Sequence, residues 1–274
     1  MGIVRRAFLI ARVQIVRQNT SMRTLRKVKS VLQIFGILFV VIIVLGAIIY
    51  FRQRSMLFFP THRANSGRLV PWSDGNRTIG YCREVPNPRT IWLMMHGNAG
   101  QAADRDYVLQ RMSEEDSLYV VEYPGYGSRK GNPSLESMNQ AASEAYQLLR
   151  SRNPNIPVCV LGESIGSGPA CALAQEKIEP DKILLVVPFD SLAKVASRHF
   201  PFLPVRFMLR DDWNNVESLR RYAGPVEIVG AVGDTIIPIE HAKALATQVP
   251  RARFIAIEGG HNDWSENDQV KIQR

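Results

Sequence analysis

Six short apolar runs, separated by longer segments with helical spacing, constrain the fold of this chain most strongly. The runs cover residues 91–95, 118–121, 158–161, 183–187, 226–232 and 254–257. Runs that are apolar throughout are typical of strands buried on both faces of a parallel sheet. Helical spacing of apolar residues recurs between most of them, in the segments 102–113, 135–150, 165–177 and 238–248. We therefore predict an α/β domain with a mostly parallel, doubly wound sheet.

The interval between the fourth and fifth runs breaks this alternation. It is too long for one crossover helix and too short for a separate domain. We expect a small helical cap over about residues 190–222, on the carboxyl edge of the sheet, where open α/β folds bind ligands.

A run of apolar residues near the N-terminus, 31–51, contains no charged side chain and only one strongly polar residue, Gln33. At about 1.5 Å per residue, such a helix spans the roughly 30 Å hydrocarbon core of a bilayer. We predict a single transmembrane helix, because a signal peptide would have a shorter apolar region followed by a cleavage site of small residues. The expected organisation is an arm (1–30), this helix (31–51), a connector (52–76) and a folded domain (77–274).

The formal net charge of +9 is concentrated at one end of the chain. Residues 1–73 hold 12 of the 34 basic residues and none of the 25 acidic ones, so residues 74–274 carry about −3. The folded domain is therefore mildly acidic, which excludes a nucleic-acid partner. Eight basic residues precede the apolar helix and four follow it, which favours a cytoplasmic N-terminus with the domain on the opposite side. Residues 2–17 fit either a basic amphipathic helix on anionic lipid or a disordered arm.

The three cysteines, Cys82, Cys159 and Cys171, form neither a disulfide framework nor a zinc site, because they are odd in number and widely spaced. Cys159 and Cys171 fall in a strand pattern and a helix pattern, where a free thiol packs as a small apolar group. We expect neither a metal nor an organic cofactor, and the redox compartment stays undetermined.

The run 158–161 leads directly into Gly162-x-Ser164-x-Gly166, and a helical pattern follows. A serine on such a strand–turn–helix has a strained backbone and needs small neighbours two positions away on each side, since strand and helix pack closely there. Its hydroxyl lies above the strand end, beside a helix N-terminus that favours a developing anion. Ser164 is thus a candidate nucleophile, although the motif alone also occurs in ordinary glycine-rich turns.

A nucleophilic serine needs a base and an acid that orients the base. His261 follows the last apolar run, after two glycines that let the loop turn back, and is the candidate base. Asp234 follows the preceding run and is the candidate acid, with a helix N-cap as the alternative role. Asp190, which follows the fourth run, is the rival acid, and both keep the chain order serine, acid, histidine.

The candidate oxyanion donors are the backbone N–H groups of Asn98, in the loop His96-Gly97-Asn98-Ala99-Gly100, and of Ile165. The competing interpretation of that loop is a phosphate-binding loop, but the Lys-Ser/Thr ending of such loops is absent. The segment Tyr123-Pro124-Gly125-Tyr126-Gly127 is expected to shape a neighbouring loop, with its tyrosines at the rim of the pocket.

Five motifs occur in order: HGNAG (96–100), EYPGYG (122–127), GESIGSG (162–168), GDTIIP (233–238) and GGHND (259–263). Together they resemble the α/β-hydrolase fold, and they are most similar to the small membrane-anchored serine hydrolases of the α/β-hydrolase-domain-containing group. The resemblance covers about residues 55–274 and implies a triad of Ser164, Asp234 and His261 with an oxyanion hole at Asn98 and Ile165. Asp190 departs from the pattern, where a neutral residue is expected.

The expected function is hydrolysis of a carboxylic ester or thioester through an acyl-enzyme intermediate. An anchor would keep the site near lipid or lipidated substrates, and the cap phenylalanines Phe200, Phe202 and Phe207 would either line an acyl pocket or pack the cap onto the body. Two alternatives stay open: a serine peptidase of the same fold, and a non-catalytic α/β-hydrolase-like binding protein.

Overall fold

The computed structural model describes residues 2–65 and 67–274, and within residues 1–31 it describes only the side chains of Met22 and Lys29. The chain divides into two units, Met1–Arg52 and Gln53–Arg274. Helix α1 (Gly2–Leu57) makes up most of the first unit. The side chains of residues 2–17 lie outside those described, so the amphipathic arm stays a prediction.

Helix α1 carries the predicted apolar run. Its segment Leu32–Leu57 has a mean hydropathy of 3.1, and no part of its most apolar stretch is buried. In length and composition this segment fits a membrane anchor or a signal sequence.

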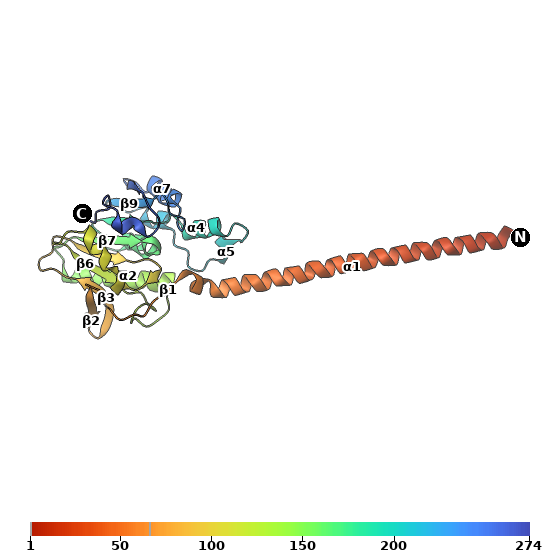
Figure 1. The fold of residues 1–274 in the computed structure, drawn as a ribbon, viewed down its shortest axis with the longest axis horizontal. Helices are drawn as coiled ribbons and strands as arrows, with labels where there is room; N and C mark the ends of the chain where they lie inside the picture. The colour runs from red at the N-terminus through yellow and green to blue at the C-terminus, as the bar shows by residue number, and fades with distance from the viewer. Residues whose placement is uncertain (1, 66) are drawn as a thin grey trace. The chain divides into compact units, whose positions relative to one another are not determined.

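The second unit is built on one sheet of eight strands among the described residues, in the order β10-β9-β8-β7-β4-β6-β3-β2 (Figure 1). The strands are β2 (Val70–Asp74), β3 (Arg77–Arg83), β4 (Ile91–Met95), β6 (Ser117–Val121), β7 (Val158–Glu163), β8 (Ile183–Val186), β9 (Val226–Ala231) and β10 (Arg253–Ile257). The six predicted runs correspond to β4 and β6–β10, which all pair in parallel. The predicted α/β fold with a mostly parallel sheet is therefore confirmed.

Strands β2 and β3 pair antiparallel at one edge and had no predicted counterpart. In β2 only Trp72 is buried, and in β3 the buried residues are interspersed with partly exposed ones. Neither strand therefore gives a continuous apolar run.

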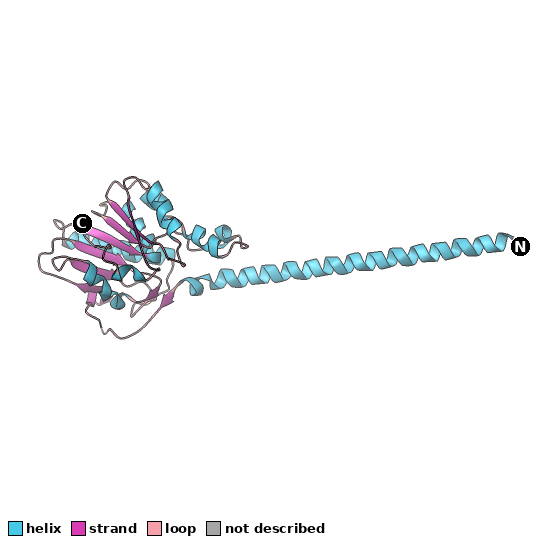
Figure 2. Cartoon of the chain, turned by 45° about the horizontal axis from the view of Figure 1, so that its top comes forward, coloured by secondary structure: helices cyan, strands magenta, loops and turns pink. Residues whose placement is uncertain are grey.

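Helices cover both faces of the sheet (Figure 2). They are the 3-10 helix η1 (Ala102–Arg111), α2 (Leu135–Arg152), α3 (Ser167–Ala172) and α7 (Ile239–Gln248). Successive residues of β4 enter different cores: Leu93 and Met95 pack with α2 and α3, whereas Trp92 and Met94 pack on the η1 face. The buried, unbridged cysteines follow this packing, with Cys159 in one core and Cys171 in the other.

The predicted cap is present as α4 (Leu192–His199), α5 (Val205–Met208) and α6 (Asn215–Leu219). The expectation for its phenylalanines is wrong for two of the three. Phe202 is 98% exposed and Phe207 is 87% exposed, so neither lines a pocket nor packs the cap onto the body.

The chain between α1 and β2 is integrated into the second unit. Phe58 is buried, and the centroid of its ring lies 6.5 Å from that of the Trp213 ring. Strand β1 (Phe59–Pro60) pairs with β5 (Ala99–Gly100), which lies in the HGNAG loop. The Asn98 side chain also donates to the carbonyl of Leu57 at 3.0 Å.

Two titratable side chains lie fully buried behind that loop. His96 Nε2 and the Glu122 carboxylate are 3.9 Å apart, and His96 Nε2 and Glu122 Oε2 have no hydrogen-bond partner among the described residues. Burial lowers the pKa of His96 well below its ordinary value and raises the pKa of Glu122 from 4.5 to about 7. Burial therefore favours the neutral form of both groups.

Replacing Glu122 with glutamine should remove part of the pH dependence of stability. Because folding raises the Glu122 pKa from 4.5 to about 7, the folded chain binds this proton more tightly, and the free energy of unfolding falls as pH rises through that window. Relative to Glu122→Gln, the wild type should lose about 3 kcal/mol between pH of about 4 and about 8. Denaturant titrations in detergent, followed by tryptophan fluorescence, measure the difference. Glu115→Gln, at an exposed carboxylate, is the control, and equal pH profiles for the wild type and Glu122→Gln would contradict the assignment.

Candidate active site

Ser164 lies at the turn between β7 and the helical segment after it. Its φ is +54°, in the left-handed region that a residue with a side chain rarely adopts. A methyl group added at Gly162 would lie 2.7 Å from the Ala170 side chain, and one added at Gly166 would overlap the Met95 carbonyl. The small residues predicted on both sides of Ser164 are therefore required by the close packing of strand and helix.

His261 lies between Ser164 and Asp234. Its Nε2 is 2.8 Å from Ser164 Oγ, and its Nδ1 is 2.6 Å from Asp234 Oδ2. With the ring proton on Nδ1, His261 donates to Asp234 and accepts from the Ser164 hydroxyl. The three residues follow the carboxyl ends of β7, β9 and β10, which meet at one edge of the sheet.

Asp234 is held by its own turn. Its Oδ1 accepts the backbone N–H groups of Ile236 and Ile237, both at 2.8 Å, while Oδ2 faces His261. The N-cap of α7 is Pro238, so the alternative role of Asp234 as that cap is wrong.

The rival acid, Asp190, faces a different histidine. Its carboxylate is 2.8 Å from His241 Nδ1 and 2.5 Å from Lys194 Nζ, and it accepts the Ser191 N–H. These hydrogen bonds outweigh its burial and lower its pKa to about 2. The structure thus joins Asp234, and not Asp190, to His261.

The HGNAG loop lies beside the serine. A methyl group added at Gly97 would be 3.8 Å from Ser164 Cβ, which places the Gly97–Asn98 backbone next to the nucleophile candidate. The expectation that Tyr123 and Tyr126 rim a pocket is wrong, because both are fully buried. Their hydroxyls instead donate to the carbonyls of His96, at 3.0 Å, and Asn98, at 2.7 Å. These bonds fix the loop that carries the predicted oxyanion donor.

Glu163, which precedes the serine, was not singled out from the sequence. Its carboxylate accepts the Gly97 N–H at 3.1 Å and the Trp264 indole N–H at 3.0 Å, and the Tyr107 hydroxyl donates to it at 2.9 Å. Trp264 stands three residues after His261, so one carboxylate connects the serine turn, the HGNAG loop and the histidine loop. No local pattern reports these contacts, because each partner comes from a different part of the chain.

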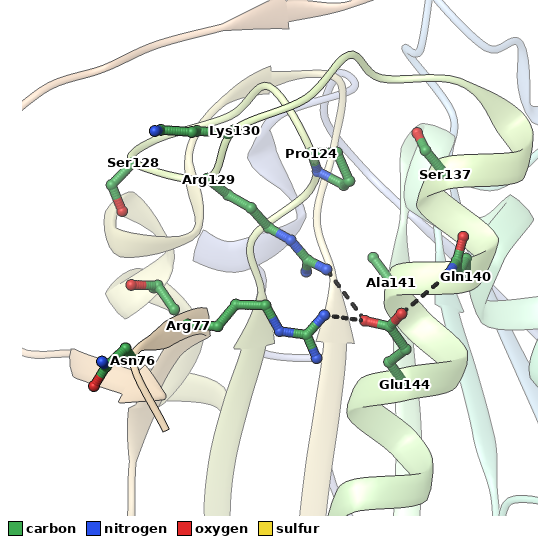
Figure 3. A pocket seen from close by; sticks show the side chains of 11 residues that line it. Asn76, Arg77, Pro124, Ser128, Arg129, Lys130, Ser137, Gln140, Ala141 and Glu144 are labelled. Carbon is green, nitrogen blue, oxygen red and sulfur yellow. Dashed lines mark hydrogen bonds and ion pairs between the residues drawn. The ribbon is translucent and has the colours of Figure 1, made fainter. Parts of the chain in front are cut away.

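A cavity of about 530 Å³ lies elsewhere, between the start of β3 and the N-terminal half of α2 (Figure 3). Arg77 and Arg129 both point at Glu144, at 3.0 and 3.4 Å. This is an ion-pair network, and none of Ser164, Asp234 and His261 lines the cavity. Among the side chains that the structure describes, no group of three or more His, Cys, Asp or Glu residues could hold a metal ion.

No family model matches the chain. An uncharacterized protein of Mycobacterium tuberculosis is 29% identical over 232 residues, 78% of this chain and 82% of that protein. Alpha/beta hydrolase domain-containing protein 17B of Xenopus tropicalis is 31% identical over 199 residues, 70% of this chain and 67% of that protein. Lysophosphatidylserine lipase ABHD12 of Danio rerio is 28% identical over 186 residues, 60% of this chain and 48% of that lipase. This chain therefore spans about half the length of that lipase.

Solved structures agree on the fold. An esterase of Pyrococcus furiosus superposes with a TM-score of 0.56 over 77% of this chain and 94% of that one, at 12% identity. Taken with the identity to protein 17B over two thirds of each chain, this likeness shows that the chain belongs to the α/β-hydrolase-domain-containing family.

Proposed function

We propose that this protein is a membrane-anchored serine hydrolase that cleaves carboxylic esters or thioesters through an acyl-enzyme intermediate. The observation that carries the proposal is the continuous hydrogen-bonded line from Ser164 Oγ through His261 to Asp234. A serine, a histidine and a carboxylate in this order are the parts that nucleophilic acyl transfer requires.

In the proposed reaction, Ser164 Oγ attacks the carbonyl carbon of the substrate while His261 Nε2 takes the hydroxyl proton. Asp234 stabilises the imidazolium that forms, and the N–H groups of Asn98 and Ile165 bind the oxyanion. His261 then protonates the departing alcohol or thiol, which leaves an ester on Ser164. Water attacks this ester with His261 again as base, and the free acid departs.

The proposed substrates are lipid-like esters or thioesters. The relative named a lysophosphatidylserine lipase supports this class, and so does the apolar run at residues 31–51, which we propose as the membrane anchor. We propose a cytoplasmic N-terminus with the hydrolase domain on the opposite side, because more basic residues precede this segment than follow it.

The two alternative functions have less support. A non-catalytic binding protein has no need of Ser164 at a strained φ within hydrogen-bonding distance of His261. A serine peptidase would have the same catalytic residues, and the short cap helices offer little surface to bind an extended peptide.

Replacing Ser164 with alanine should abolish hydrolysis of p-nitrophenyl esters and acyl thioesters, because the nucleophile is removed. We expect kcat to fall by a factor of at least about 10⁴ and labelling by a fluorophosphonate probe to disappear. Ser151→Ala, at an exposed serine late in α2, is the control and should keep both. A wild type that is folded but neither labelled nor active would exclude the proposal.

Replacing Asp234 and Asp190 with asparagine, one at a time, tests which of them is the catalytic acid. Asp234→Asn should lower kcat by about 10⁴, because His261 loses the carboxylate that fixes its tautomer and stabilises its cation. Asp190→Asn should leave kcat within a few-fold and lower stability, since it weakens the contacts to His241 and Lys194. Steady-state kinetics and thermal unfolding of both variants test this, and a large kcat loss confined to Asp190→Asn would reverse the assignment.

Glu163→Gln should lower kcat by about 10- to 100-fold while the fold is kept. All three groups that contact the Glu163 carboxylate are donors, and a glutamine NH₂ would face either the Gly97 or the Trp264 N–H. Tyr107→Phe, which removes a donor from the same carboxylate but frees neither of these two loops, is the matched control and should have a smaller effect. Equal kcat values for the wild type and Glu163→Gln would show that the carboxylate does not position the site.

A further inference from the structure

Two phenylalanines of the cap lie almost entirely in solvent. Phe202 and Phe207 are 98% and 87% exposed, although Phe is among the side chains most often buried. In α5 the buried residue is Val205, and Phe207 stands two positions later, on the opposite side of the helix. Val205 therefore packs α5 onto the body, while the Phe207 ring, like that of Phe202, lies in solvent.

The same segment carries basic side chains. Residues 191–210 contain Lys194, Arg198, Arg206 and Arg210 and no acidic residue, although Asp190, Asp211 and Asp212 directly flank them. The rest of residues 74–274 holds 18 basic and 25 acidic residues, so this segment is more basic than the rest of the domain. We call Phe202, Phe207, Arg198, Arg206 and Arg210 the cap surface. Aromatic rings flanked by arginines are typical of surfaces that bind the interface of an anionic bilayer.

The cap is also tied to the end of the apolar segment. The Gln53 side chain donates to the Met208 carbonyl at 3.1 Å and accepts a hydrogen bond from the backbone N–H of Arg210 at 2.8 Å. Arg54 makes two bonds to Asp211, at 2.7 and 3.0 Å, and that carboxylate is 4% exposed. Figure 1 shows α4 and α5 projecting from the body.

Gln53 follows Phe51, the last residue of the apolar run, by only two positions. At about 1.5 Å of rise per residue, the point where the chain leaves a bilayer lies within a few Å along the helix of these contacts. The bonds of Gln53 and Arg54 to the cap would therefore keep the cap within a short distance of the lipid surface.

We propose that the cap surface docks on the anionic lipid bilayer in which α1 is anchored, with Phe202 and Phe207 inserted at the interface and the arginines on lipid phosphates. This inference rests on the membrane anchor of the proposed function. Docking would place the cap, which lies at the edge of the sheet that carries Ser164, against the lipid from which an acyl substrate is drawn.

Quenching by brominated lipid tests the docking directly, without any need for activity. The full chain carrying Phe202→Trp or Phe207→Trp is reconstituted in vesicles of phosphatidylcholine and phosphatidylglycerol, with and without bromine on the acyl chains. The four native tryptophans, Trp72, Trp92, Trp213 and Trp264, are each at most 6% exposed, so they are shielded from the bromine atoms and add a background that bromine leaves constant. The matched control is Ile178→Trp, at another apolar side chain that is 60% exposed and lies outside the cap surface.

We expect bromine to quench the fluorescence that Phe202→Trp and Phe207→Trp add, and to leave that of Ile178→Trp unchanged. Equal quenching at all three positions would overturn the proposal. It would also be overturned if Phe202→Ser with Phe207→Ser dissociated an oligomer of the wild-type chain in detergent, because the cap surface would then contact a second copy. Flotation of the wild type with the vesicles tests the anchor separately.

Activity provides a second readout. The double variant Phe202→Ser with Phe207→Ser should hydrolyse a vesicle-embedded ester about tenfold more slowly and a short soluble ester at the wild-type rate. Ile178→Ser should match the wild type on both substrates. Unchanged hydrolysis of the embedded ester by the double variant would count against the docking, whereas a wild type inactive on every ester would count against the proposed function instead.

Discussion

The left-handed turn at Ser164 is the constraint on which the site depends. A non-glycine residue at φ +54° costs about 1–3 kcal/mol, and it persists only where the surroundings fix it. Here the helix after β7 packs so closely on the strand that neither Gly162 nor Gly166 has room for a side chain. The same packing presses Gly166 against the carbonyls of Met95 and His96, which brings the HGNAG loop beside Ser164. The close packing at Gly162 and Gly166 therefore fixes the position of Ser164 relative to the loop that carries the predicted oxyanion donor.

Buried hydrogen bonds hold the loops around this turn from two sides. On one side, Glu163 collects donors from the HGNAG loop and from Trp264 near His261. On the other side, the hydroxyls of Tyr123 and Tyr126 and the connector strand β1 fix the same HGNAG loop. Since a buried group is costly to leave unsatisfied, these contacts resist independent movement of the loops. A loop fixed in this way can hold a backbone donor in place, as the predicted oxyanion hole requires.

The connector and the cap link the proposed chemistry to the proposed location. Through Gln53 and Arg54, the chain that leaves the apolar helix is bonded to the cap, and through Leu57 it is bonded to Asn98. The cap carries a local excess of positive charge on a domain that is otherwise acidic. Within the folded unit, the connector is thus bonded both to the cap and to the loop beside Ser164, which is consistent with the proposed action on membrane lipids.

The sequence alone determined the parallel sheet, the apolar helix and the chain order of Ser164, Asp234 and His261, because buried strands, membrane-length helices and strand-end residues each leave a local pattern. It did not reveal β2 and β3, which are half solvated, nor the exposure of Phe202 and Phe207, since hydrophobicity favours burial but does not show where a cap faces. Only the tertiary structure decided which aspartate faces His261 and what Glu163 binds. Asp190 and Asp234 both follow strands of the same sheet, and hydrogen bonds between segments up to 101 residues apart depend on distances in space that no local pattern encodes.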